Sequence, residues 1–360
     1  MFKTYKGQGY KRSDLTSKGD PIILYGSMYT NYKTFISEID TFTKLSKNSV
    51  LSEPNDIIIP SSGETASEIS RASVVKESNV ILGGDLNILR KRFDKINSIF
   101  IALQLTYGSA STDLARKAEG QSVVHLYNSD IKQSNVYLTK SSEQNKISSF
   151  IEFLEKTITL HQKKLEKLEE LKKAYLQQLF SKNHEIYPKL KFANFKNNLA
   201  KCELGSLFKS ISSRKYITTP NNEGKYDVIQ QGSNSYIGFS DETPFKNYKD
   251  VIIFGDHTLS LMMPKNPFLL ATDGLKVIKG LNINKDYLYY VILYNMPNSQ
   301  GYKRHFSLLK DRVAIITTDC NEQKMIAALM KKIDTLINHT QSKIDQLNTL
   351  KKSYLQNMFV

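Results

Sequence analysis

The feature that most constrains this chain is an internal repeat of 38 positions at an offset of 179 residues. Residues 143–180 align without a gap to residues 322–359, and 14 of the aligned positions are identical. The ends of the two copies are most alike, reading LKKAYLQQLF in the first and LKKSYLQNMF in the second. Self-similarity on this scale indicates that one structural unit occurs twice.

Both copies have the pattern of a long helix. Neither contains Gly or Pro, and their apolar residues recur with the four-three spacing of a coiled-coil seam. Polar residues interrupt the seams at equivalent positions, and such residues can fix register and partner choice in a coiled coil. These positions are His161 and Thr340, then Lys172 and Lys351. Two such helices in one chain can pair with each other, and the alternative is a plain dimerisation element.

Two segments of similar size lie before and between these helices. Both contain short β-branched and aromatic runs bounded by turn residues, which is typical of strands. Residues 22–27 (IILYGS) resemble residues 228–233 (VIQQGS), and residues 56–60 (DIIIP) resemble residues 250–254 (DVIIF). The sequence therefore predicts an α+β fold with two domains and two long helices. The expected boundaries are 1–141 and 184–320 for the domains, and 142–183 and 321–360 for the helices.

Charge and composition limit the possible functions. The formal net charge is +15, from 50 Lys and Arg against 35 Asp and Glu. A basic excess suits contact with a polyanion, because cations that neutralise phosphates release condensed counterions. The other interpretation is a basic protein from a lysine-rich proteome. Cys202 and Cys320 suggest no disulfide framework, and the N-terminus lacks the apolar core of a signal peptide, so we expect a soluble cytoplasmic protein.

The motifs that catalysis on DNA would need are missing from the sequence. No Pro-Pro occurs for the amino-group clamp of a DNA methyltransferase, and no GxxxxGK[ST] loop is present for a motor. The six histidines form no ligand-like pair. Residues 223–225 have the E-x-K spelling of many nucleases, but no paired upstream Asp accompanies them. We expect a binding role without metal or cofactor, and the rival interpretation is an enzyme with an unrecognised active site.

The order of domain, long helix, domain, long helix resembles the specificity subunits of type I restriction-modification systems. Residues 143–147 and 322–326 resemble the EQ-x-x-I helix opening of that family, and both LKKxYLQ ends resemble its helix closings. Residues 9–15 and 25–32 are similar to its target-recognition domains. This resemblance covers nearly the whole chain.

The resemblance implies a function in sequence recognition. Each domain would be a target-recognition domain that reads one half of a split site in double-stranded DNA. The helices would pair antiparallel, set the spacer between the half-sites and dock two methyltransferase subunits, to which a restriction subunit adds. The chain would not be catalytic by itself. The alternative function is a scaffold that tethers two other ligands through the coiled coil.

Candidate DNA contacts lie in Gly- and hydroxyl-rich loops near the matching motifs. Arg and Lys can pair with guanine, and Asn and Gln with adenine, whereas most other contacts position phosphates. In the first domain the candidates are Lys6, Tyr10, Lys11, Arg12, Tyr25, Tyr29, Thr30, Tyr32, Ser61, Ser62 and Arg71. In the second domain they are Gln231, Ser233, Asn234, Tyr236, His257, Thr258, Lys303, Arg304 and His305. For each residue the alternative is a solvated loop side chain.

Apolar residues crowd the ends of both helices beyond the needs of one seam. They are Leu171, Tyr175, Leu176 and Phe180 in the first copy and Leu350, Tyr354, Leu355 and Phe359 in the second. We expect them to dock the methyltransferase subunits. The alternative is that they pack the coil and the bases of the domains.

The first domain departs from the family at its start. The second domain opens with residues 202–208, well upstream of Gly232, whereas only 25 residues precede Gly26. The equivalent opening strand is therefore expected to be absent. Either Met1 is an internal start, or this domain begins differently.

Overall fold

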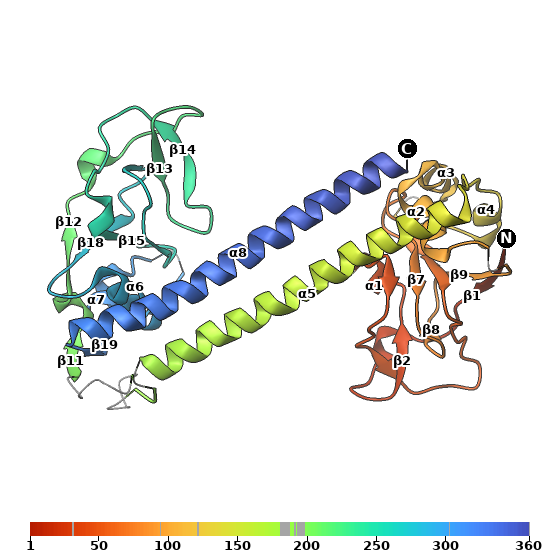
Figure 1. Cartoon of the computed structure of the whole chain (residues 1–360), viewed down its shortest axis with the longest axis horizontal. Coiled ribbons are helices and arrows are strands. Elements are labelled where there is room, and N and C mark those ends of the chain that lie inside the picture. Colours follow the sequence, from red (N-terminus) through yellow and green to blue (C-terminus); the bar gives the residue numbers. More distant parts are fainter. Residues whose placement is uncertain are drawn as a thin grey trace. The chain divides into compact units, whose positions relative to one another are not determined.

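The chain divides into two compact units. The computed structural model describes residues 1–30, 32–93, 95–120, 122–180, 188–190, 192, 199–301 and 303–359. Unit 1 comprises Met1–Gln162 and Ser342–Val360, and unit 2 comprises Lys163–Gln341. Each unit contains one mixed α/β domain and about half of each long helix (Figure 1). The expected α+β class is confirmed.

The repeated segments form two helices of 39 residues each, α5 (Ser141–Leu179) and α8 (Cys320–Met358). They begin one residue before the expected boundaries, and the expected helix residues 181–183 and 360 lie outside the described residues. None of the twelve residues with four-three spacing is exposed. The seam residues are Ile147, Ile151, Leu154, Ile158, Leu165, Leu168, Ile326, Met330, Ile333, Ile337, Ile344 and Leu347. None of the described helices combines the length and apolarity that a bilayer crossing requires.

The lysines that interrupt the seams form ion pairs between the helices. In unit 1 Lys351 pairs with Glu155, and in unit 2 Lys172 pairs with Asp334 at 2.7 Å. The residue number rises on one helix as it falls on the other, so the helices are antiparallel. The repeat offset of 179 residues converts one pair into the other. Both units therefore contain the same interhelical contact.

The domain of unit 1 has a five-stranded sheet in the order β1-β9-β5-β7-β3. Helix α2 (Ser98–Tyr107) covers one face, where its apolar residues share a core with the seam of α5. The other face packs against a smaller sheet in the order β4-β2-β8 through a second apolar cluster. The strands are β1 (Phe2–Lys6), β2 (Asp20–Ile23), β3 (Phe35–Ile36), β4 (Phe42–Thr43), β5 (Asp56–Pro60), β7 (Ser73–Val75), β8 (Ile81–Leu82) and β9 (Leu86–Lys91).

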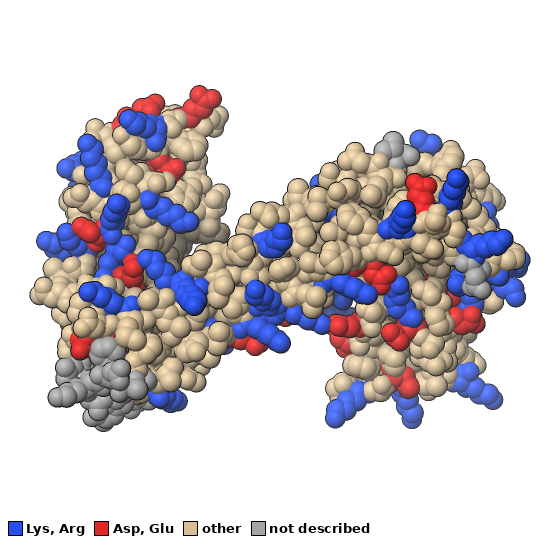
Figure 2. Space-filling view, viewed as in Figure 1, with Lys and Arg blue, Asp and Glu red and all other residues tan. Residues whose placement is uncertain are grey.

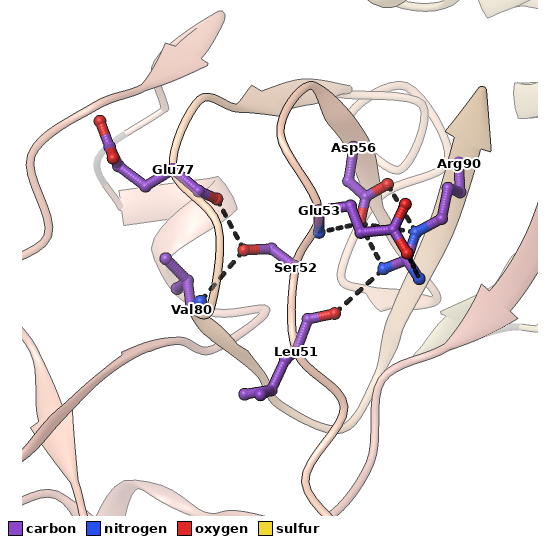
Figure 3. A network of polar contacts seen from close by, with 7 residues as sticks. All are labelled: Leu51, Ser52, Glu53, Asp56, Glu77, Val80 and Arg90. Atoms are coloured by element: carbon purple, nitrogen blue, oxygen red, sulfur yellow. Dashed lines mark hydrogen bonds and ion pairs between the residues drawn. The ribbon is translucent and has the colours of Figure 1, made fainter. Parts of the chain in front are cut away.

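Arg90 joins β9 to the segment that leads into β5 (Figure 3). Its guanidinium donates to Asp56 from Nε at 3.0 Å and from Nη2 at 2.7 Å, to Glu53 at 2.7 Å, and to the carbonyl of Leu51 at 3.0 Å. The Asp56 side chain is only 1% exposed. A buried carboxylate needs such partners, because desolvating an unpaired charge is costly.

The domain of unit 2 has a four-stranded sheet in the order β12-β18-β15-β16, a sheet β14-β13-β17 and a strand pair β11-β19. Helix α6 (Lys285–Tyr294) packs on the first sheet as α2 does in unit 1. The strands are β11 (Leu199–Glu203), β12 (Phe208–Ile211), β13 (Tyr226–Ile229), β14 (Tyr236–Ser240), β15 (Val251–Gly255), β16 (Leu261–Met262), β17 (Phe268–Leu270), β18 (Leu275–Gly280) and β19 (Val313–Thr317).

Strand pairing shows which parts of the two domains correspond. Strand β2 runs parallel to β8 in unit 1, and β13 runs parallel to β17 in unit 2, with Ile23 and Ile229 in equivalent register. The predicted match of residues 22–27 to residues 228–233 is therefore confirmed. The second predicted match is displaced by one residue. Strand β5 begins at Asp56 and β15 at Val251, because Asp250 ends a short 3-10 turn instead.

The starts of the two domains differ in the described residues. In unit 2 β11 pairs with β19 along all five residues of each strand. In unit 1 residues 134–140, which precede α5 as β19 precedes α8, belong to no strand. Strand β1 corresponds to β12, because each pairs antiparallel with the strand at the same place in its sheet. The structure thus has no counterpart of β11 in the described part of unit 1.

Candidate nucleic-acid interface

Four segments of unit 1 converge at one edge of its sheet. Tyr29 donates its hydroxyl to the carbonyl of Ser62 at 2.9 Å. The Oγ of Ser62 lies 3.1 Å from Nδ1 of His125 and 3.5 Å from Oδ1 of Asp85. The serine follows β5, the aspartate precedes β9, and the histidine lies in the short strand β10 (Val124–His125). These segments lie far apart in the sequence, so the fold creates this cluster.

Local backbone geometry explains why the segments can meet. Strand β10 pairs with β6 (Ser62–Gly63), which places His125 opposite Ser62. Gly63 leaves room for the ring of Tyr29, because a Cβ atom there would lie 2.3 Å from the tyrosine hydroxyl. Asp85 has a left-handed backbone with φ of 59°, which Asp adopts more readily than most residues. The turn before β9 thereby presents its carboxylate at this edge.

Exposed basic and aromatic side chains surround the cluster. The ring of Tyr127 stacks on that of His125, with centroids 6.4 Å apart. The Nζ atom of Lys6 lies 5.9 Å from the Tyr127 ring centroid. Lys6, Tyr25 and Tyr127 are exposed. Aromatic rings beside cations can contact bases and phosphates, so the edge has the composition of a nucleic-acid contact.

The Ser62–His125 contact does not form a catalytic triad. A serine nucleophile needs a histidine base whose second nitrogen is oriented by an acid. Here the Asp85 carboxylate contacts Ser62 rather than the imidazole. The arrangement can hold a histidine in place, and among the described residues no group of His, Cys, Asp and Glu could hold a metal ion.

The remaining candidates of the first domain divide into exposed and internal residues. Lys11 and Arg12 are exposed in a 3-10 turn, and Thr30 is exposed at the end of α1 (Ser27–Thr30). Ser61 is buried. Arg71 pairs with Glu68. Thr30 could therefore reach a ligand directly, whereas Ser61 is enclosed and Arg71 already has an acidic partner.

Two tyrosine candidates use their hydroxyls within the chain. Tyr32 donates to the carbonyl of Ala72 at 3.0 Å, and burial raises its pKa well above the usual value. The hydroxyl of Tyr10 accepts from the amide of Ser46 at 2.8 Å. Tyr10 also lines an open depression of about 550 Å³ with Gln8, among other polar residues. Tyr10 therefore shapes a polar surface, whereas Tyr32 fastens the loop to the core.

In unit 2 the structure brings the candidates of two loops together. The amide of His257 donates to Oε1 of Gln231 at 3.0 Å, and the amide of Gly232 donates to Oγ of Ser260 at 3.1 Å. Thr258 donates to the same Ser260 hydroxyl at 3.0 Å. Gln231 corresponds to Tyr25 when β13 is aligned with β2. The candidate contacts of both domains therefore include the same place in the fold.

The exposed candidates of unit 2 lie near this loop pair. Ser233, Asn234 and Tyr236 are exposed where β13 turns into β14. Lys303 and Arg304 are exposed, and Arg304 lies 3.3 Å from Asp273. These side chains could reach a ligand without rearrangement of the core.

His305 differs from its neighbours because it is fully buried. Its amide donates to Oδ1 of Asp256 at 2.8 Å, and its Nδ1 lies 2.9 Å from the carbonyl oxygen of Asp256. Its Nε2 accepts from the amide of Gln300 at 3.0 Å. Both ring nitrogens are therefore satisfied inside the chain. The expected DNA contact at His305 is corrected to an internal anchor that holds the loop carrying Lys303 and Arg304.

The apolar residues at the helix ends also divide into two groups. Phe180, Leu355 and Phe359 are buried in the cores of the two units, and Tyr175 and Leu176 pack partly against the core of unit 2. Leu171 and Leu350 are each 42% exposed, and Tyr354 is 37% exposed. The two exposed leucines are equivalent in the repeat. The chain thus presents the same apolar residue once on each helix.

Positive side chains occur on both units. Figure 2 shows Lys and Arg spread over the visible face of each domain, with Asp and Glu interspersed among them. This distribution is consistent with contacts to a polyanion by both domains.

Comparison with known proteins identifies the class. The family described as "Type I restriction modification DNA specificity domain" matches residues 1–170. The specificity subunit of the type I restriction enzyme MjaVIII from Methanocaldococcus jannaschii is 22% identical over 355 residues, which cover 87% of this chain and 80% of that protein. The S subunit of a type I restriction-modification system from M. genitalium has a similar fold. Its TM-score is 0.74 at 16% identity, over 100% of this chain and 94% of that chain.

A further solved structure, concerned with complex assembly and conformational transition of the type I restriction-modification system, has a TM-score of 0.50 at 14% identity over 95% of this chain and 92% of that chain. The family match thus covers residues 1–170, slightly less than half of the 360-residue chain. The resemblance to type I specificity subunits that the sequence indicated is confirmed.

Proposed function

We propose that the chain recognises a bipartite sequence in double-stranded DNA, with each domain reading one half. The observation that carries this proposal is the repeated edge. Tyr25 in unit 1 and Gln231 in unit 2 each lie two residues after the end of equivalent strands, and each edge gathers polar side chains from several loops. Two equivalent readers in one chain suit two separate half-sites. The chain is not an enzyme by itself, so its part in a type I system is recognition.

The helices have two proposed functions in the assembled complex. A straight helix of 39 residues is about 58 Å long, which exceeds one turn of DNA at roughly 34 to 36 Å. Helices of this length could set the spacer between two half-sites. The equivalent exposed residues Leu171 and Leu350 would each contact one methyltransferase subunit, because an interface that occurs twice fits two copies of one partner. A restriction subunit would complete the system.

An exchange of domains tests whether the two readers are independent. The second domain, residues 184–320, is replaced by that of a relative with a different target, and the assembled complex is used to map DNA methylation. One half of the modified sequence should change, while the other half and the spacer stay the same. Exchange of residues 1–141 is the matched control, and it should change only the opposite half. If either exchange altered both halves together, independent reading would be refuted.

A further inference from the structure

We propose that His125 reads an exocyclic amino group on a base edge, N6 of adenine or N4 of cytosine, and that Asp85 and Ser62 orient its imidazole for this contact. The inference rests on the proposed function, because it assumes that this edge of unit 1 faces DNA. To the proposed function this inference adds which residue contacts the base and which hydrogen-bonding group on the base it selects. None of the three residues is buried.

The neighbouring groups favour one orientation of the hydroxyl proton. A carboxylate can only accept, so the hydroxyl of Ser62 has an acceptor in Asp85, 3.5 Å away. The Oγ atom is then an acceptor for the N–H of His125 at Nδ1, 3.1 Å away. A neutral imidazole carries one N–H and one acceptor nitrogen. With Nδ1 protonated in this way, Nε2 is the acceptor that would meet an amino group.

Strand alternation turns the His125 side chain away from the core. Its neighbours Val124 and Leu126 are 6% and 0% exposed, and successive residues of a strand point to opposite faces. The backbone is held by two hydrogen bonds with Glu119, at 2.7 and 3.1 Å. The exposed ring of Tyr127 stacks on the imidazole. A side chain that is already ordered loses little entropy when it binds.

The surroundings fit a base contact rather than a phosphate contact. Lys6, near the ring of Tyr127, supplies the positive charge that a phosphate requires. The Asp85 carboxylate would repel a phosphate that approached Ser62 directly. A base edge carries no net charge, so the carboxylate would not repel it. The cluster therefore separates a cation at its margin from a neutral acceptor at its centre.

Unit 2 has a different side chain at the corresponding place. Leu126 donates its amide to the carbonyl of Ser61 at 3.0 Å, and His305 donates its amide to the carbonyl of Asp256 at 2.8 Å. The residue preceding His305 is Arg304, which is exposed. Guanidinium groups only donate hydrogen bonds, and their common target is guanine. At this place in the fold unit 1 thus presents a hydrogen-bond acceptor and unit 2 a donor. The two half-sites would therefore differ.

The test maps DNA methylation by the full-length chain assembled with its methyltransferase partner. Wild type should require adenine or cytosine at one position of the first half-site. His125→Ala should reduce that preference by about fivefold, the effect of losing one hydrogen bond. His125→Arg should shift the preference toward guanine, and Asp85→Asn should weaken it. The second half-site should remain unchanged in all three variants.

Arg304→Ala is the matched control, and it should relax only the second half-site. A thermal unfolding profile like that of wild type shows that each variant is folded. An unchanged base preference in folded His125→Ala and His125→Arg would overturn the inference while leaving the bipartite reading intact. Wild-type complex that modified no bipartite site would overturn the proposed function and this inference with it.

Discussion

At the scale of single residues, the Asp56–Arg90 pair shows how unit 1 keeps a charge inside the protein. The Asp56 carboxylate is 1% exposed and accepts from two guanidinium nitrogens. The hydrogen bonds to Asp56 are the main cause of the raised pKa of Arg90. Glu53 binds the same guanidinium, but its side chain is 61% exposed. One cation thus has a buried and an exposed partner, whose contributions can be compared directly.

We predict that Asp56→Asn destabilises unit 1 by about 3 to 5 kcal/mol, because it leaves the partly buried guanidinium without its internal anion. The control Glu53→Gln should cost at most about 1 kcal/mol, as is usual for exposed ion pairs. Hydrogen exchange of the β5 and β9 amides is the appropriate measurement, because chains with several domains often unfold in more than one step. Equal effects of the two substitutions would contradict this assignment.

The candidate site was only partly predictable from single residues. Ser62 and Tyr29 were predicted because they lie in hydroxyl-rich loops near strand-like runs. Asp85 and His125 were missed, because their contacts with Ser62 span 23 and 63 residues of sequence. His305 was expected to contact DNA together with Lys303 and Arg304. Its burial depends on the backbone and carboxylate of Asp256, which no local pattern reveals.

At the scale of helices, the two interhelical ion pairs are also tied to the domains. Glu155 accepts from the hydroxyl of Thr34 at 2.6 Å in unit 1, and Asp334 accepts from the hydroxyl of Tyr290 at 2.7 Å in unit 2. Burial, and then the neighbouring Asp334 carboxylate, raise the pKa of Tyr290, so this tyrosine remains a donor. Each acidic residue therefore connects its own helix, the opposite helix and a domain.

We predict that Lys351→Glu destabilises unit 1 by about 3 to 5 kcal/mol, because two carboxylates then meet in a largely buried place. The double variant Glu155→Lys with Lys351→Glu should recover most of this loss. A double-mutant cycle on the free energy of unfolding measures the coupling. Lys156→Glu, at an exposed position of α5 next to Glu155, is the control and should have little effect. Failure of the double variant to recover stability would show that the pair does not fix the register.

The four-three spacing was enough to predict both helices, and none of the twelve residues with this spacing is exposed. It also drew attention to Lys172 and Lys351, whose charges interrupt the apolar pattern. Their partners were not predictable in the same way. Glu155 and Asp334 lie beside seam residues, and their match to the lysines depends on an antiparallel register that the spacing of one helix does not contain.

At the scale of the whole molecule, Leu171 and Leu350 are the equivalent exposed residues from which assembly can be tested. We predict that Leu171→Glu and Leu350→Glu together prevent co-purification of methyltransferase subunits, because each adds a charge to an apolar contact. Either substitution alone should leave one subunit bound, as measured by native mass spectrometry. Leu160→Glu, at a position 68% exposed on α5, is the matched control and should leave assembly unchanged. Two bound subunits in the double variant would refute this docking site.

The division of the chain into units has a consequence for its genetics and engineering. Unit 2 is one unbroken stretch, Lys163–Gln341, whereas unit 1 is unbroken only if the end of the chain is followed by its beginning. If the end of the sequence is joined to its beginning, each unit is therefore one continuous segment. A circular permutant opened between residues 162 and 163, with the original termini linked, would keep every unit contiguous. By the same reasoning, a gene fragment for one unit would encode a chain that pairs with a second copy of itself. That homodimer would read two identical half-sites, which form a palindrome.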